Sequence, residues 1–207
     1  IKESIAEAKA DMQTKTALLQ SRHICGEAKL TVEFHKKFRK FLQKDSPWEY
    51  LQARRNDQKK RRAKHLDTVF VQEPDIKNGV GGLRDFQNLI WMAEVKFGIS
   101  SLGGLLEAGY IQKGEHKELT EAYDFLLRVR NELHFQSSHP TNTLLLDKQP
   151  LVAFSLGYRQ RNMLKRVERF MRDYYAHARK IYTLTNALEK HFLLPEETDH
   201  GLRNRLV

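Results

Sequence analysis

The chain has 207 residues, of which 40% are hydrophobic and 30% are charged, and its formal net charge is +10. That apolar content suffices for one full hydrophobic core, and the charged fraction is too low for a disordered chain. Cys25 is the only cysteine, which excludes an internal disulfide and a cysteine-based metal site. No run approaches the roughly 20 apolar residues that span a bilayer, and the first residues do not resemble a signal peptide. We therefore expect a cytoplasmic protein without membrane contact and, since the chain lacks an initiator Met, a piece of a longer protein.

The first third of the chain predicts three helices. Residues 1–25 are expected to form one helix, because apolar side chains recur at helical spacing and Gly26 follows as a stop. Residues 30–41 carry Leu and Phe on one stripe and predict a second helix. The Ser-Pro-Trp-Glu sequence of residues 46–49 is typical of a capped helix start with proline at the first helical position. The third helix therefore begins there and continues through a basic run to about residue 65.

The next segment changes character. Residues 68–71 (Thr-Val-Phe-Val) are β-branched and aromatic, and they are the best strand candidate in the chain. A glycine-rich loop at residues 78–82 then leads into a helix that Gly98 ends. These patterns predict a mainly α fold, a helical bundle with at most one or two short strands near residues 67–76.

The second half of the chain predicts further helices. Short helices are expected at residues 101–108 and 150–156, on either side of a longer helix at residues 114–137. Apolar side chains over residues 164–188 alternate steps of three and four, which is typical of a helix packed along a neighbouring helix. Residues 196–207 form a polar tail.

A glycine-rich block at residues 73–87 (Glu-Pro-Asp-Ile-Lys-Asn-Gly-Val-Gly-Gly-Leu-Arg-Asp-Phe-Gln) carries the main functional signal. Its glycines lead directly into a helix, where free backbone N–H groups attract anions and the missing Cβ lets a phosphate approach. Two basic side chains add charge-assisted contacts. The candidate nucleotide-binding or phosphate-binding residues are Lys77, Gly79, Gly81, Gly82 and Arg84.

The same block has a purely structural interpretation. It is neither a Walker A loop nor a dinucleotide fingerprint, and a tight turn braced by Arg84 and Asp85 accounts for its glycines equally well. Asp75 is considered either as a late catalytic carboxylate or as a brace of the loop. The histidines lack metal-ligand spacing with one another, so no metal-binding residue is assigned.

The block resembles the Glu-Pro-x-Ile-Lys-x-Gly-x-Gly-Gly-Leu-Arg-Asp-x-Gln signature of bacterial PII uridylyltransferase/uridylyl-removing enzymes. Other segments match that family in the same order and cover nearly the whole chain. They are residues 16–22 with Gly26, Arg61 and His65, residues 126–134, residues 156–158 and residues 167–175. One departure is the loop at residues 138–144, which lacks the Arg and Asp of the family's Arg-x-x-Asp-Arg-Leu element.

The resemblance implies an enzyme that transfers UMP from UTP to the PII nitrogen-signalling protein with Mg²⁺ as cofactor. Family members hold the metal with an Asp-x-Asp strand. This sequence contains no Asp-x-Asp, so the chain alone is expected to be inactive and to bind no cofactor tightly. The implied domains are a helical end of the nucleotidyltransferase region (1–66), a strand and glycine-rich junction loop (67–82), a helical bundle domain (83–195) and the tail (196–207).

Two alternatives stay open. Glutamine synthetase adenylyltransferases share a related Lys-x-Gly-x-Gly-Gly-Ile-Arg-Glu block, although the Leu-Arg-Asp-x-Gln version here favours the uridylyltransferase. A basic helical module for RNA or DNA would use the +10 charge, but no nucleic-acid motif appears and the basic cluster at residues 54–62 lacks interleaved aromatics. That cluster is expected to contact an acidic protein or a nucleotide, or to form a solvated helix surface.

Overall fold

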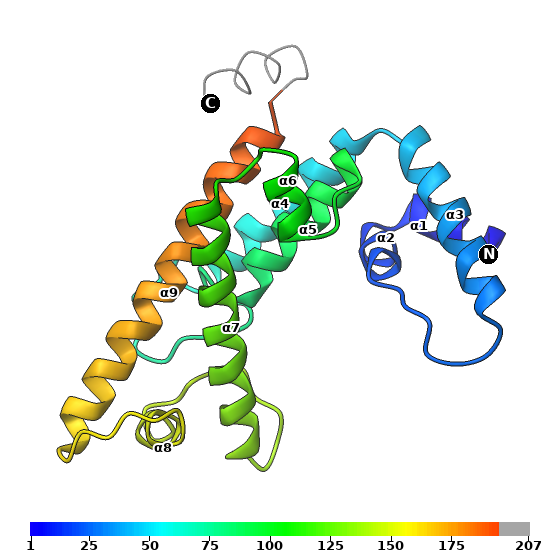
Figure 1. The fold of residues 1–207 in the computed structure, drawn as a ribbon. Coiled ribbons are helices and arrows are strands. Elements are labelled where there is room, and N and C mark those ends of the chain that lie inside the picture. The colour runs from blue at the N-terminus through cyan, green and yellow to red at the C-terminus, as the bar shows by residue number, and fades with distance from the viewer. Residues whose placement is uncertain (195–207) are drawn as a thin grey trace.

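The computed structural model describes residues 1–194, which form helices joined by loops (Figure 1). Within these residues the only β-type pairing is an isolated antiparallel bridge between Asp75 and Thr143. The prediction of a mainly α fold is therefore confirmed. The predicted tail at residues 196–207 lies outside the described residues. No helix in the described range combines the length and the apolar character that crossing a bilayer requires.

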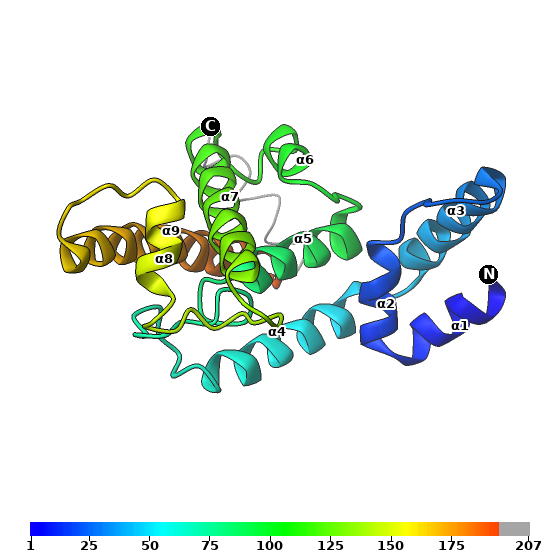
Figure 2. The same cartoon turned by 90° about the horizontal axis from the view of Figure 1, so that it is seen from below.

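The helices differ widely in length, and the last one is the longest. In chain order they are α1 (Lys2–Ala10), α2 (Met12–Leu19), α3 (Ala28–Lys44), α4 (Pro47–Ala63), α5 (Leu83–Phe97), α6 (Leu102–Glu107), α7 (Lys113–Phe135), α8 (Gln149–Ser155) and α9 (Met163–Phe192). The first three lie to one side of the others, with α2 beside the end of the α4–α5 pair (Figure 1 and Figure 2).

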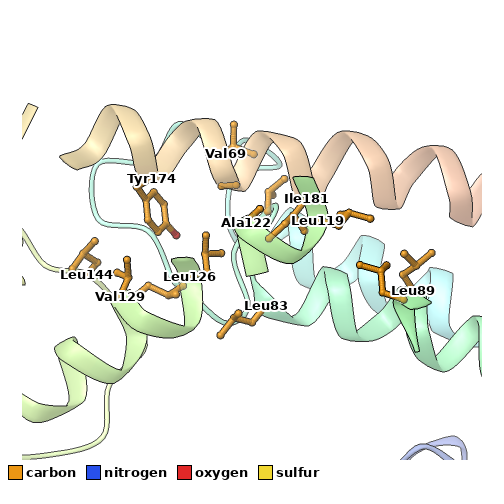
Figure 3. Packing of buried hydrophobic residues seen from close by; sticks show 14 of the residues in the cluster. Val69, Leu83, Leu89, Leu119, Ala122, Leu126, Val129, Leu144, Tyr174 and Ile181 are labelled. Atoms are coloured by element: carbon orange, nitrogen blue, oxygen red, sulfur yellow. The ribbon is translucent and has the colours of Figure 1, made fainter. Parts of the chain in front are cut away.

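The core lies between α5, α7 and α9 (Figure 3). Leu119, Leu126 and Leu133 recur every seven residues along α7, and all three are fully buried. Their face packs on α9, where Ile181 is also fully buried. Burying each such side chain contributes roughly 1.5–3 kcal/mol, so the α7–α9 contact is a main source of stability. The apolar spacing in the sequence predicted both helices.

Several predicted helix boundaries are found in the structure. Gly98 ends α5 in the left-handed conformation, with φ of 72°. Ser101 accepts a hydrogen bond from the Gly104 N–H as the N-cap of α6. Pro47 begins α4 as predicted, although the Ser46 side chain makes no capping hydrogen bond. Residues with strong local conformational preferences therefore marked most boundaries correctly.

The prediction of a single helix over residues 1–25 is wrong. Asp11 has an extended backbone between α1 and α2, and its side chain accepts a 2.6 Å hydrogen bond from the Thr14 N–H. This N-cap begins a new helix in a different direction. The second helix ends at Leu19, six residues earlier than expected.

The strand candidate at residues 68–71 does not form a strand. Val69 is buried, whereas Phe70 is 63% exposed and packs its ring against Tyr175 of α9. The Tyr175 hydroxyl donates to the Val71 carbonyl oxygen at 2.9 Å. A strand needs a partner for its backbone groups, and here a side chain of α9 supplies one of those contacts.

Candidate functional site

The glycine block begins with a turn that Asp75 holds together. One carboxylate oxygen of Asp75 accepts from the backbone N–H groups of Lys77 at 2.9 Å and Asn78 at 2.6 Å. The other oxygen accepts from the Asn78 side-chain amide at 3.2 Å. Both oxygens of Asp75 are therefore engaged within the loop, which is the geometry of a loop brace.

The glycine N–H groups are also engaged within the block. Gly79 donates to the Asp75 carbonyl oxygen at 2.8 Å, and Gly82 donates to that of Gly79 at 3.0 Å. Gly81 donates to the Asp85 carboxylate at 2.9 Å. A phosphate at this helix start would have to displace these partners. Phosphate binding by the three glycines therefore stays a prediction.

Gly81 has a further packing role. Its φ is +70°, and a Cβ at this position would lie 2.1 Å from the Ala178 carbonyl oxygen of α9. Only a residue without a side chain permits this approach of the loop to the helix backbone. The glycine block therefore fixes the start of α5 against α9.

Asp85 joins this block to α4. Its carboxylate is fully buried and accepts from Arg61 Nη2 at 2.6 Å and from Arg62 Nε and Nη2 at 3.1 and 2.9 Å. Arg62 also donates to the Asn186 side chain of α9 at 2.7 Å. A buried carboxylate is stable only when cations and N–H groups surround it. This arrangement ties α4, α5 and α9 together.

Uncharged polar side chains extend the cluster along α4 and α5. Gln58 and Asn88 both donate to Glu189 Oε1, at 2.9 and 3.1 Å, and Arg54 Nε donates to Asn88 Oδ1 at 2.8 Å. Burial raises the pKa of the Glu189 carboxyl to about 7. We call these residues the α4–α5 polar network: Arg54, Gln58, Arg61, Arg62, Asp85, Asn88 and Glu189.

A pocket of about 450 Å³ adjoins the network, between α2 and the α4–α5 pair. We call it the arginine pocket, because Arg54, Arg61 and Arg84 line it, together with Asp57 and Trp91. The guanidinium carbons of Arg54 and Arg84 lie 4.7 and 5.3 Å from the centre of the Trp91 ring. Two cations therefore share one aromatic side chain in the pocket wall.

The arginine pocket has an excess of positive charge. Its one carboxylate, on Asp57, lies 3.7 Å from Arg54 and is 48% exposed. Burial, followed by the positive charges of Arg54 and Arg61, lowers the pKa of the Arg84 guanidinium below its ordinary value. Arginine nevertheless stays protonated because its ordinary pKa is so high. The pocket therefore favours an anion.

The structure separates the candidates that the sequence placed in one block. Arg84 lines the arginine pocket, and Asp85 lies in the buried network behind it. Lys77 is partly exposed on the loop, and it does not line that pocket. The block therefore contributes one side chain, Arg84, to the pocket.

Sequence reasoning missed the burial of the basic side chains of α4. Arg54 is only 6% exposed and Arg62 only 7%, whereas Lys59 and Lys60 are exposed. The signal lay in the spacing, because Arg54 and Arg62 continue the stripe that the buried Tyr50 begins. A solvated helix surface therefore describes only part of this cluster.

The described residues do not fit a Mg²⁺ site. No three His, Cys, Asp or Glu side chains gather within residues 1–194 in a way that could hold a metal ion. Both oxygens of Asp75 accept hydrogen bonds within the loop. No step of a reaction is therefore assigned to a metal held by these residues.

Comparison with known proteins places this arrangement in a family. The model of the GlnD PII-uridylyltransferase family matches residues 49–189, from the first turn of α4 to Glu189. Bifunctional uridylyltransferase/uridylyl-removing enzymes are similar over most of the chain. That of Stutzerimonas stutzeri is 35% identical over 93% of this chain and 21% of its own length. That of Aliivibrio fischeri is 36% identical over 93% of this chain and 22% of its own length.

A third relative, from Rhodospirillum rubrum, is 33% identical over 89% of this chain and 20% of its own length. The chain thus spans about a fifth of the length of the curated relatives it matches. The matched region contains the glycine block, the α4–α5 polar network and the helices of the core. The resemblance seen in the sequence is confirmed, and the chain belongs to the GlnD PII-uridylyltransferase family.

Proposed function

We propose that this chain is a helical part of a cytoplasmic bacterial enzyme that transfers UMP from UTP to the PII nitrogen-signalling protein. The observation that carries this proposal is the family match over residues 49–189, which includes the entire glycine block. The nucleotidyl-transfer step needs carboxylates that hold Mg²⁺ against the triphosphate. Because residues 1–194 do not gather such a group, we propose that other parts of the parent enzyme supply it and that this chain alone is inactive.

We further propose that the glycine block and α4 form one wall of the nucleotide site. The α4–α5 polar network holds this wall rigid, which catalysis by positioning requires. Among the block residues, Arg84 is the strongest candidate for a phosphate contact, because it lines the arginine pocket. Lys77, Gly79, Gly81 and Gly82 stay predicted contacts. The division of the chain near residues 66 and 83 is also a proposal.

The test uses the full-length protein that contains this chain. It is incubated with PII and with UTP labelled on the α-phosphate, and labelled PII is measured. We expect label on PII from UTP, and none when the 207-residue chain replaces the full-length protein. Transfer from ATP to glutamine synthetase, without transfer from UTP to PII, would instead assign an adenylyltransferase.

A further inference from the structure

We propose that the arginine pocket is a binding site for a polyphosphate group, carried by a nucleoside triphosphate or free in solution. Three guanidinium groups and one carboxylate line its volume of about 450 Å³, which is within the usual range for small-ligand sites. Guanidinium groups form paired, charge-assisted hydrogen bonds with phosphate oxygens. A polyphosphate group offers several such oxygens along a length that more than one arginine can contact.

Two of the three arginines are held in place before any ligand arrives. Arg54 is 6% exposed and donates to the Asn88 side chain at 2.8 Å. The Arg61 side chain is 13% exposed and is fixed by Asp85 at 2.6 Å and by the Asn78 carbonyl oxygen at 2.7 Å. A ligand therefore does not have to order these long side chains, and that favours binding.

Among the three arginines of the pocket, Arg84 is the one whose side chain is free to bind an anion. Within residues 1–194 no carboxylate lies at ion-pairing distance from the Arg84 side chain, whose guanidinium carbon lies 5.3 Å from the centre of the Trp91 ring. The positive charges of Arg54 and Arg61 act on it across the pocket. An anion between these side chains would relieve that repulsion.

The pocket wall also contains donors without acceptors. Arg61 Nε and Trp91 Nε1 are buried and have no hydrogen-bond partner among the described residues. Most buried donors in proteins are paired, and both residues line the arginine pocket. Both atoms are buried beneath the pocket surface, so the guanidinium groups, and not these donors, carry the proposal.

A second basic pocket of similar volume provides the internal comparison. It lies beside the α8–α9 loop and includes Arg128, Arg159 and Arg169, all of which are exposed. Exposed cations are screened by solvent and salt, so each contributes less to binding. We therefore expect the arginine pocket to bind a polyphosphate group more tightly than this pocket.

The test is calorimetric titration of the full 207-residue chain with inorganic triphosphate, UTP, ATP and uridine. Arg84→Gln should weaken triphosphate binding by about tenfold or more, the effect of losing one charge-assisted contact.

Arg179→Gln is the matched control, because Arg179 is an exposed arginine on α9 that lines neither pocket. Arg169→Gln tests the second pocket. Asp57→Asn should tighten binding, because it removes the carboxylate of the arginine pocket. Melting curves verify that each variant is folded.

The outcomes separate the possible explanations. Tighter binding of UTP than of inorganic triphosphate assigns the group to a nucleotide, and the reverse order assigns it to free polyphosphate. Both support the site. Absence of triphosphate binding, equal losses of affinity in Arg84→Gln and Arg179→Gln, or a loss of affinity in Arg169→Gln alone would overturn it.

The preference for UTP over ATP rests on the proposed function, whereas triphosphate binding does not. Binding without PII labelling by the full-length protein would therefore refute the proposed function and leave the site intact.

Discussion

The fully buried Asp85 carboxylate lies 2.6 Å from Arg61 Nη2 and 2.9 Å from Arg62 Nη2, so consecutive arginines of α4 bind one aspartate of α5. These contacts join positions more than twenty residues apart in the chain. Arg61 also lines the arginine pocket. Asp85, which holds Arg61 in place, is therefore a fully buried residue that orients this wall of the pocket. The position of the pocket therefore depends on the α4–α5 polar network.

Asp85→Asn should destabilise the fold by about 3–5 kcal/mol. The change leaves the buried Arg62 and the largely buried Arg61 without their carboxylate, which is a large loss for desolvated ion pairs. Urea denaturation would measure the free energy of unfolding. Asp124→Asn is the control, because Asp124 is exposed on α7 and should change stability by less than about 0.5 kcal/mol. Equal effects of the two substitutions would show that the network does not hold the helices together.

Glu189→Gln should remove a pH dependence of stability. Burial raises the pKa of the folded-state carboxyl from 4.5 to about 7. The protonated carboxyl therefore makes its full contribution to the free energy of unfolding below pH 4.5. That contribution is lost as pH rises through 7. The Gln side chain is neutral at every pH and can accept the same hydrogen bonds from Gln58 and Asn88.

Relative to Glu189→Gln, the natural chain should therefore lose on the order of 3 kcal/mol of unfolding free energy between pH 4.5 and 8. Urea denaturation at intervals over this range gives the two profiles. Glu118→Gln, on the surface of α7, serves as the charge-matched control, since the Glu118 side chain is 48% exposed. Parallel profiles for the natural chain and Glu189→Gln would contradict the prediction.

Gly81→Ala and Gly98→Ala form a matched pair. Both glycines have nearly the same positive φ, +70° and +72°, so both substitutions carry a similar backbone strain of about 1–2 kcal/mol. The added Cβ meets nothing within 4 Å at Gly98, whereas at Gly81 it lies 2.1 Å from the Ala178 carbonyl oxygen.

Gly81→Ala should therefore cost about 1–3 kcal/mol more than Gly98→Ala, the usual penalty for inserting a methyl group into packed structure. Thermal or urea unfolding measures the difference. A smaller cost at Gly81 than at Gly98 would show that the block does not press against α9.

The sequence predicted those parts of the fold that depend on local or periodic signals. The seven-residue spacing of Leu119, Leu126 and Leu133 indicated the core face of α7, and all three side chains are fully buried. The break at Asp11 was missed, because the apolar spacing continues across it and only the capping geometry changes the direction of the chain.

The arginine pocket depends on contacts that no local pattern contains. Gln58 reaches Glu189 across 131 positions, and Arg62 reaches Asn186 across 124. A run of basic residues is compatible with a solvated surface until its distant acidic partners are known. Arg84 was identified only because it belongs to the glycine block, whereas Arg54 needed the packing of α4 on α5 to be recognised as part of a pocket.

The most direct test of the account is the KM for UTP of the full-length protein that contains this chain, with PII as acceptor. Arg84→Gln should raise the KM for UTP about tenfold or more and leave the KM for PII unchanged, since it removes a charge-assisted phosphate contact. Arg179→Gln should match the unaltered enzyme in both constants. An Arg84→Gln enzyme with an unchanged KM for UTP, or with a raised KM for PII alone, would contradict a nucleotide site at the arginine pocket.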